Sequence, residues 1–575
     1  MIRGSSRIMT TIGTEFAMNN RVSIIGLDGA TFRLILPWVK EGKLPTLAGM
    51  MQKGSWGNLE STIHPLSPQA WASFMTGKNP GKHGIFEFIE HKPYSYDLNY
   101  VNGGFVQGNK LWDILSDTGK RVCIINVPFT YPPDKVNGYL ISGLDSPGIR
   151  SDFCYPPSLL EEITKKFGEY QLRQHPYNAT PESFLKKITE QFDYILKVAK
   201  YLKVKETWDL FMVVFESTDL VQHFYWHYAF PEEFGIPPTD NKNLREAMFE
   251  IYKQIDDGLR EFLTSCSVDE TVMVMSDHGF SPCRKIFFMD TWLHKHGYLS
   301  YHQKDQKNYS LMRALHISFQ KYVPGRLKGW VTSLAPGLKE KVRSYLTFSN
   351  IDWSHTKAFS LGIDSTNIFI NLKGRFPEGN VMDGKDYEDL RDEITGKLEK
   401  LTDPETRERI VEKVYRREEL YHGDYLEKAP DLLVTWKNFE YNTRRSYGKE
   451  ENGDSFLGSS LEFSDVSHYS SLQKSGTHHL KGVFIAQGHM IKNNSPIKGA
   501  RIIDLAPTIL YLMGEKVQKD MDGRILQEIV RDEFLSNHPI RFSSSELEKK
   551  EKVSGYSEGE ESYIRDKLKG LGYID

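Results

Sequence analysis

The sequence predicts an α/β protein built on a mostly parallel, doubly wound sheet that is flanked by helices. Apolar runs of strand length alternate with longer helix-forming stretches along most of the 575 residues, and this alternation is typical of repeated βαβ units. Several of the apolar runs end abruptly in a carboxylate or a glycine. Open parallel sheets present their functional side chains at that edge.

The elements follow along the chain from local composition. Strands are expected where apolar runs stand between turn-forming residues: 22–27, 121–128, 138–143, 210–215, 271–275, 358–362, 368–372, 429–434 and 483–486. Helices are expected at 44–53, 243–266 and 386–401. Residues 301–346 interrupt the alternation with a Lys- and Arg-rich amphipathic stretch, which we expect to form an inserted helical cap and which could contact a membrane surface.

Composition excludes several classes of protein. The chain is 39% hydrophobic and 26% charged with a formal net charge of −3, an ordinary globular profile without the basic surplus of a nucleic-acid-binding protein. No window approaches the length of a transmembrane helix, and residues 1–20 lack the apolar core of a secretory signal. The 4 cysteines are widely spaced and form no Cys-x-x-Cys motif. We therefore expect a reducing compartment, the cytoplasm.

Asp277-His278-Gly279 follows the apolar run 271–275 and is the most informative motif. Carboxylate oxygen and imidazole nitrogen are ligands suited to zinc or a similar divalent ion. By itself the pair could be a capped strand end, but three further segments have the same character. Their candidate ligands are Asp28 after the run 22–27, Asp219 with His223 after the run 210–215, and His478 in Gly476-Thr477-His478.

Asp219 and His223 are four residues apart, so a helix would place them on one face. The whole set of three Asp and three His exceeds the needs of one tetrahedral zinc and suits two ions. Paired ions serve phosphoryl chemistry because they neutralise the phosphate and hold the attacking and leaving oxygens.

Ser67 is the candidate nucleophile. Ser67-Pro68 is typical of a helix start, with Ser67 expected at the N-cap and Pro68 at the first helical position. A helix N-terminus offers free N–H groups and a positive dipole end, which favour a phosphate. A metal-bound serine oxygen would also have a lowered pKa and act as a nucleophile.

These motifs, together with Thr76-Gly77 and His83-Gly84-Ile85, follow one another in the order found in the alkaline phosphatase superfamily, which the chain resembles. Within that superfamily it resembles the type I phosphodiesterase/nucleotide pyrophosphatase family, and the resemblance runs from about Val22 to about Leu526. The resemblance implies an alkaline-phosphatase-like fold. It implies one metal site at Asp28, Ser67, Asp277 and His278, and another at Asp219, His223 and His478. Zinc is the first expectation, and manganese suits the same ligands.

The chain departs from the family near Ser67. The animal nucleotide pyrophosphatases carry an Asn that holds a phosphoryl oxygen, and Ala70 stands in its place. Gln69 or a backbone N–H at the helix start would have to substitute. The Cys-x-Pro-x-Arg motif of the sulfatases, or its Ser equivalent, is absent around Ser67, which disfavours sulfatase activity. His479 adjoins His478, but the Gly-x-His spacing favours His478 as the ligand.

The resemblance implies cleavage of phosphodiester or pyrophosphate bonds through a phospho-serine intermediate. Phosphomonoesterase and phosphotransferase activities stay open, as does a non-catalytic protein that binds a phosphate ligand. A nucleotide, a sugar phosphate or a lipid head group could be the substrate, since a fold does not determine it. We expect an N-terminal extension at 1–20, a catalytic domain at 21–530 with an insertion at about 300–350, and a charged tail at 531–575 with a docking helix.

Overall fold

The computed structural model describes residues 20–149, 152–176, 179–302, 351–361, 367–444, 463–465, 474–543 and 555–571. The expected extension at 1–20 and the cap segment 301–346 fall almost entirely outside these residues. The division into domains therefore stays a prediction. Within the described ranges, no helix is both long and apolar enough to cross a membrane.

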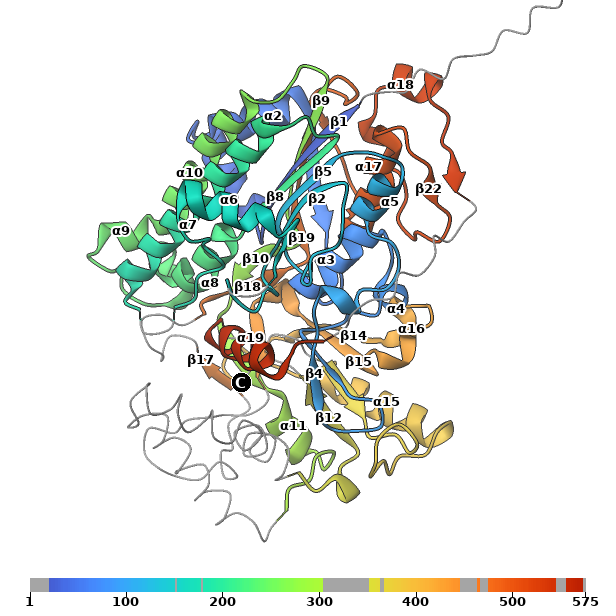
Figure 1. Ribbon diagram of the computed structural model, residues 1–575. Helices are drawn as coiled ribbons and strands as arrows, with labels where there is room; N and C mark the ends of the chain where they lie inside the picture. Colours follow the sequence, from blue (N-terminus) through green and yellow to red (C-terminus); the bar gives the residue numbers. More distant parts are fainter. Residues whose placement is uncertain are drawn as a thin grey trace, which may run out of the picture.

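A ten-stranded sheet lies at the centre of the described structure (Figure 1). Its strands β1, β5, β6, β8 and β9 run parallel to their neighbours in this set, and β19 runs antiparallel to β9 and β2. This confirms the predicted mostly parallel sheet. In spatial order the strands are β20 (Ser495–Pro496), β2 (Gly54–Glu60), β19 (Lys481–Gln487), β9 (Glu270–Met275), β1 (Arg21–Leu27), β8 (Leu210–Phe215), β5 (Val122–Val127), β6 (Gly138–Ser142) and β7 (Cys154–Tyr155), with β21 (Ala500–Arg501) beside β2.

The burial of the three middle strands explains why their sequences are almost uninterruptedly apolar. β1 lies between β8 and β9, and every residue of β8 and β9 is buried. Because helices cover both faces of a parallel sheet, its central strands have no solvent side on which to place polar residues. The apolar runs therefore end where the strands end, and buried polar residues follow at the edge of the sheet.

Helices cover the two faces of the sheet (Figure 1). On one side lie α2 (Pro45–Lys53), α7 (Pro181–Lys205) and α10 (Ala247–Leu263), and on the other α3 (Ser67–Thr76), α5 (Leu111–Asp117) and α17 (Leu505–Leu512). The helix predicted at 243–266 is divided into α9 (Lys242–Arg245) and α10. The other helices of this part are α1 (Phe32–Lys40), α4 (Pro80–His83), α6 (Ser158–Phe167), α8 (Ser217–Ala229) and α18 (Asp532–Asn537).

A four-stranded antiparallel sheet lies below the central sheet in Figure 1. It contains β12 (Ala358–Leu361), β13 (Asn367–Ile370), β15 (Leu432–Trp436) and β14 (Val411–Arg416), and it packs with α15 (Lys385–Leu398). Shorter elements connect the parts: β3 (Ile89–His91), β4 (Leu98–Tyr100), β10 (Gly279–Pro282), β11 (Lys285–Phe288), α11 (Met289–Lys295), α16 (Arg417–Leu420), β16 (Tyr441–Arg444), β17 (Phe463–Asp465), β18 (Gly476–His479), β22 (Val517–Gln518) and β23 (Phe542–Ser543).

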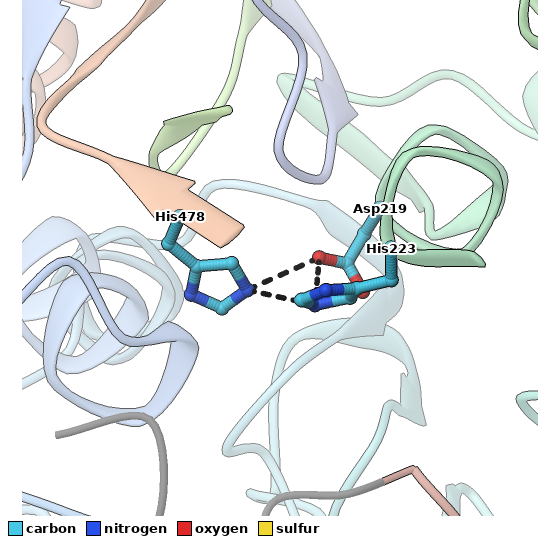
Figure 2. A group of neighbouring side chains, drawn as sticks. All are labelled: Asp219, His223 and His478. Carbon is cyan, nitrogen blue, oxygen red and sulfur yellow. Dashed lines mark hydrogen bonds and ion pairs between the residues drawn. The ribbon is translucent and has the colours of Figure 1, made fainter. Parts of the chain in front are cut away.

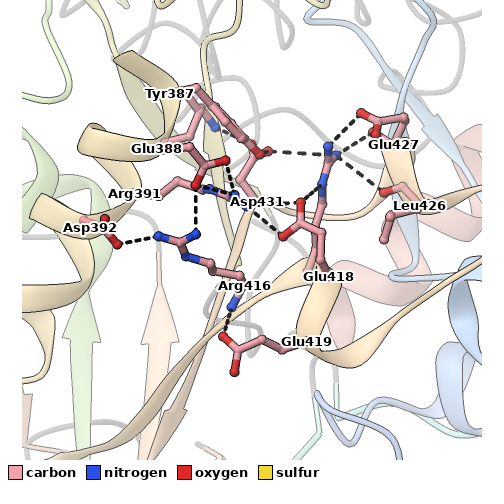
Figure 3. Close-up of polar contacts among 12 residues, drawn as sticks. Tyr387, Glu388, Arg391, Asp392, Arg416, Glu418, Glu419, Leu426, Glu427 and Asp431 are labelled. Atoms are coloured by element: carbon pink, nitrogen blue, oxygen red, sulfur yellow. Dashed lines mark hydrogen bonds and ion pairs between the residues drawn. The ribbon is translucent and has the colours of Figure 1, made fainter. Parts of the chain in front are cut away.

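A buried carboxylate anchors the start of β15. Asp431 accepts hydrogen bonds from the backbone N–H of Ile370 at 2.6 Å, from Tyr387 and from Arg375, and Figure 3 shows the arginine–glutamate pairs around it. Burial raises the pKa of Asp431, but Arg375 and the other donors hold it below its usual value. The network fixes β15 against β13 and α15.

The last described segment returns to the main sheet. Helix α19 (Glu558–Gly570) follows Tyr556, whose ring stacks on Tyr131 with 5.8 Å between the ring centroids. The Nζ of Lys567 donates to the carbonyl of Leu144 at 2.8 Å. The loops that carry Tyr131 and Leu144 follow β5 and β6, so α19 packs at the carboxyl edge of the central sheet.

Candidate active site

Three acidic residues meet at the carboxyl edge of the central sheet. Asp28 directly follows β1, Asp277 follows β9 by two residues, and Asp219 lies in the first turn of α8, which comes after β8. Because β8, β1 and β9 are parallel neighbours, their carboxyl ends lie side by side. The fold thus brings together residues that are far apart in the sequence.

The first group consists of Asp28, Asp277 and His278, whose ligand atoms lie within 4.8 Å of one another. The Nε2 of His278 is 3.6 Å from an oxygen of Asp28 and 3.4 Å from an oxygen of Asp277. The hydroxyl of Ser67 is 3.4 Å from the same nitrogen. All four residues are buried. The structure therefore places the expected nucleophile beside the expected ligands.

The second group consists of Asp219, His223 and His478 (Figure 2). The Nε2 atoms of the two histidines are 3.0 Å apart and lie 3.3 and 3.4 Å from one oxygen of Asp219. Helix α8 provides the i, i+4 pair, as the sequence predicts. His478 reaches the pair because β18 runs antiparallel to β10, which begins at Gly279 directly after Asp277-His278. The rings of His278 and His478 stack with 3.7 Å between their centroids, so the two groups adjoin.

All three histidines present the same nitrogen to these groups. The Nδ1 atoms of His223, His278 and His478 face the carbonyls of Gly476, Gly279 and Pro65 at 3.0, 3.1 and 2.8 Å. Because a carbonyl only accepts, each Nδ1 carries the hydrogen and each Nε2 offers its lone pair. Burial lowers the pKa of His478 to about 3, so its ring is neutral. Two facing lone pairs repel each other unless a cation lies between them.

The carboxylates of the first group fit a cation as well. Neither oxygen of Asp28 has a hydrogen-bond partner, nor has Oδ2 of Asp277, and all three atoms are buried. Burial and the neighbouring carboxylates raise the pKa of Asp28, and burial raises that of Asp277. Buried carboxylates without donors are costly. The donor set of Asp oxygens and His Nε2 atoms is therefore suited to divalent ions such as zinc or manganese.

Arg173 lies between the groups and was not anticipated from the sequence. Its guanidinium contacts Asp219 and lies 3.4 Å from Glu216 and 3.9 Å from Asp28, with the side chain wholly buried. Burial raises the pKa of Asp219, but the positive charge of Arg173 opposes this effect and favours the carboxylate. Arg173 stands in a loop between α6 and α7 without a recognisable motif. Only the tertiary structure brings it to the site.

The start of α3 differs by one residue from the prediction. Leu66 is the N-cap, Ser67 is the first helical residue, and no side chain caps the helix. The predicted capping role of Ser67 is wrong because its hydroxyl is directed toward His278 instead. Gln69 donates to the hydroxyl of Tyr421 at 2.8 Å, and Ala70 is buried. The Oε1 of Gln69 is buried without a hydrogen-bond partner.

Two other histidines of the sequence motifs lie outside both groups. His479 accepts a hydrogen bond from the backbone N–H of Lys481 at 3.0 Å, whereas His478 points into the second group. The Nε2 of His83 is 2.9 Å from the hydroxyl of Ser73, and Nδ1 is 3.2 Å from the N–H of Ile85. His83 therefore links α3 to the loop after α4.

The sheet edge, the two Asp/His groups and the adjoining serine define the class of metal-dependent phosphoester hydrolases on an alkaline-phosphatase-like fold. The chain belongs to the type I phosphodiesterase/nucleotide pyrophosphatase family, whose model matches residues 22–459. This match spans most of the chain and confirms both the expected family and the expectation of an enzyme. No curated protein sequence matches the chain.

One solved structure shows the same fold, and two others are similar to the chain over most of its length. Phosphonoacetate hydrolase from Sinorhizobium meliloti 1021, in complex with phosphonoformate, is 13% identical and aligns over 86% of this chain and 95% of its own, with a TM-score of 0.51. Murine ectonucleotide pyrophosphatase/phosphodiesterase 5 is 12% identical over 89% of this chain and all of its own, with a TM-score of 0.46. The human counterpart is 13% identical over the same shares, with a TM-score of 0.45.

Proposed function

We propose that the protein cleaves phosphodiester or pyrophosphate bonds with Ser67 as the nucleophile. The observation that carries this proposal is the distance of 3.4 Å between the Ser67 hydroxyl and His278, in a group of ligands that adjoins a second one. Asp28, Asp277, His278 and Ser67 would hold one divalent ion, and Asp219, His223 and His478 another. When bound, such ions neutralise the phosphate and lower the pKa of a coordinated hydroxyl.

The proposed reaction has two displacement steps. The Ser67 oxygen attacks phosphorus and forms a phospho-serine, while the bond to the leaving oxygen breaks and the leaving group takes up a proton. Water then attacks the phospho-serine, the bond to Ser67 breaks, and the serine regains its proton. Because Ser67 stands at the start of α3, backbone N–H groups and the positive end of the helix dipole would face a phosphate bound to it.

Ser67→Ala in metal-replete protein tests this proposal. We expect hydrolysis of bis-p-nitrophenyl phosphate to fall by at least about a thousandfold, because nucleophile and general-base removal in comparable sites has effects of this order. Ser73→Ala, on the same helix and beside His83, is the matched control and should keep its activity. Full activity of the Ser67→Ala protein would show that the nucleophile assignment is wrong.

The same measurements separate the alternatives. Faster hydrolysis of p-nitrophenyl phosphate than of the diester would favour a phosphomonoesterase, and formation of a new ester in the presence of an added alcohol would favour a phosphotransferase. Binding of phosphate esters without any turnover would favour a non-catalytic binding protein. Metal analysis of the active protein should find two equivalents of zinc or manganese, and activity that survives complete chelation would overturn the metal assignment.

A further inference from the structure

Most of the candidate ligands share a pattern in which one atom faces its group and the other meets the backbone. The three histidines direct Nε2 into the groups, while each Nδ1 meets a carbonyl. The carboxylate of Asp277 follows the same pattern. Its Oδ2 is 3.4 Å from Nε2 of His278, and its Oδ1 accepts a hydrogen bond from the N–H of Gly29 at 3.2 Å. The backbone thus orients these four ligands, which leaves Asp28 and Asp219.

At Asp219 a side chain does what the backbone does elsewhere. Its Oδ1 lies 3.3 Å from Nε2 of His223 and 3.4 Å from Nε2 of His478, and Figure 2 shows both contacts meeting at this one oxygen. The outer oxygen, Oδ2, accepts a hydrogen bond from the guanidinium of Arg173. The two oxygens of Asp219 therefore have different partners, and Arg173 holds the one that is farther from the histidines.

The same guanidinium faces the outer oxygen of Asp28. The Oδ1 of Asp28 is 3.6 Å from Nε2 of His278, whereas Oδ2 is 3.9 Å from a guanidinium nitrogen of Arg173. At this distance the two form an ion pair without a hydrogen bond, so charge attraction alone acts between them. Arg173 thus lies at the outer oxygens of two carboxylates, one from each group.

A third carboxylate fixes Arg173 itself. The guanidinium is 3.4 Å from Oε1 of Glu216, and the arginine side chain is wholly buried. Glu216 is the N-cap residue of α8, so it stands three residues before Asp219 at the same end of the helix. A buried guanidinium loses its hydration and needs carboxylates to replace it. The start of α8 therefore determines where Arg173 lies.

The number of oxygens that Asp219 offers decides how many positions stay open at its group. A carboxylate can bind an ion through one oxygen or through both. With one oxygen, the second group supplies three ligands, which is the number typical of catalytic zinc sites that keep a fourth position open. With both oxygens, the fourth position would be filled. The proposed reaction ends with an attack by water, which needs such a position.

We propose that Arg173 is a positioning residue that restricts Asp219 to one ligand oxygen and so keeps a position open in the second group; this inference rests on the proposed function. Its attraction for the outer oxygen of Asp28 restricts the first group in the same way, and there Ser67 would supply the fourth ligand. Arg173 acts on the reaction through these two carboxylates. Each group is then suited to a four-coordinate ion.

Cobalt(II) tests the proposal because it binds to ligand sets of this kind and reports their geometry. Four-coordinate cobalt absorbs visible light strongly, whereas five- or six-coordinate cobalt absorbs it weakly. We expect a strong spectrum from the cobalt-loaded wild type. Arg173→Met removes the charge and the donors, so both oxygens of Asp219 become available to the ion. The absorption per bound ion should then fall by at least about twofold, because the coordination number rises.

Arg391→Met is the matched control. Arg391 is also a buried arginine, and it pairs with Glu388 and Glu418, which belong to neither group. Its loss should leave the absorption per cobalt ion unchanged. Arg173→Lys keeps a charged donor beside Asp219 and should retain most of the wild-type absorption. Metal analysis of every sample gives the cobalt content, so that lost metal is not mistaken for altered coordination.

A second variant covers the case in which Arg173→Met does not fold. Arg173→Gln keeps a polar side chain in the buried position but is shorter and uncharged, and we expect the same fall in absorption. Unchanged absorption at equal cobalt content in the variant that folds would overturn the proposal. A weak spectrum of the six-coordinate kind from the wild type, or no uptake of cobalt at all, would overturn it too.

The spectra and the hydrolysis of bis-p-nitrophenyl phosphate separate this inference from the proposed function. If the wild type cleaves no phosphate ester but Arg173→Met weakens the cobalt spectrum, the proposed function fails and the positioning role of Arg173 stands. If the wild type cleaves the diester and the two spectra are the same, the positioning role is wrong and the proposed function stands.

Discussion

At the scale of a single residue, the buried carboxylate of Asp28 lowers the stability of the folded protein. Its carboxylate is fully buried, neither oxygen has a hydrogen-bond partner, and Asp277 and Asp219 lie close enough to raise its pKa further after burial has done so. The guanidinium of Arg173, 3.9 Å away, offsets part of this repulsion. A residue in such surroundings is retained for a ligand rather than for the fold.

Asp28→Asn should therefore raise stability and abolish metal binding at the same time. The amide carries no charge, so in chelator at neutral pH we expect the free energy of unfolding to rise by about 1 kcal/mol or more. Added zinc should raise the melting temperature of the wild type but hardly that of the variant. Scanning calorimetry with and without zinc measures both effects. The surface variant Asp97→Asn is the control, and a less stable metal-free Asp28→Asn protein would contradict the interpretation.

At the scale of the elements, α19 buries a lysine whose ammonium donates to backbone carbonyls. Lys567 donates to the carbonyls of Leu144 and Ser146, and burial lowers its pKa from 10.5 to about 8, with Arg173 lowering it and Glu216 and Asp145 opposing the shift. The fold thus disfavours the charged form. The stability of the protein is reduced below pH 8 by this group and is regained as the lysine loses its proton at higher pH.

Lys567→Met should remove this dependence on pH. Relative to the variant, the wild type should gain about 2 kcal/mol of unfolding free energy between pH 8 and pH 10, since each pKa unit corresponds to about 1.4 kcal/mol. Urea unfolding of both proteins across this range gives the difference. Lys569→Met, an exposed position on the same helix, should follow the wild-type curve. A constant difference between wild type and Lys567→Met would show that the buried ammonium does not titrate in this range.

On the scale of the whole molecule, segments from near the two ends of the described chain are joined beside α3. Asp522 accepts hydrogen bonds from the N–H of Asn79 at 2.8 Å and from the ammonium of Lys82 at 2.5 Å. The N–H groups of Asp522 and Gly523 both donate to the carbonyl of Gly77, at 2.9 and 3.1 Å. These contacts connect segments more than 430 residues apart. They hold these distant segments together beside the helix that carries Ser67.

Asp522→Ala should loosen this closure. Loss of its charge-assisted hydrogen bonds should lower the free energy of unfolding by about 2 kcal/mol, because such bonds contribute roughly 1.5 to 3 kcal/mol each and water replaces part of them. The urea midpoint measures the loss. Asp532→Ala is the control: Asp532 pairs with Lys492 but its side chain is 87% exposed, and exposed pairs contribute less than about 1 kcal/mol. Equal midpoints for the two variants would contradict a role in closure.

Local sequence determined the sheet and most of its candidate ligands. Buried parallel strands must be apolar throughout, so the runs before Asp28, Asp219 and Asp277 are recognisable without a structure, and so is the i, i+4 spacing of His223. His478 could be chosen over His479 from its motif spacing, and the structure places it in the second group. The helix start at Ser67 was displaced by one residue, because local propensity does not include the contact with His278.

The tertiary structure alone decided which groups surround these ligands. Arg173 and Lys567 come from a loop and a terminal helix without motifs, and their surroundings depend on contacts between segments distant in the chain. Periodicity and capping preferences are local properties, so they locate strands and the residues that end them. Burial and charge balance arise only when those segments pack together, and therefore the place of Arg173 between the two groups could not be predicted from the sequence.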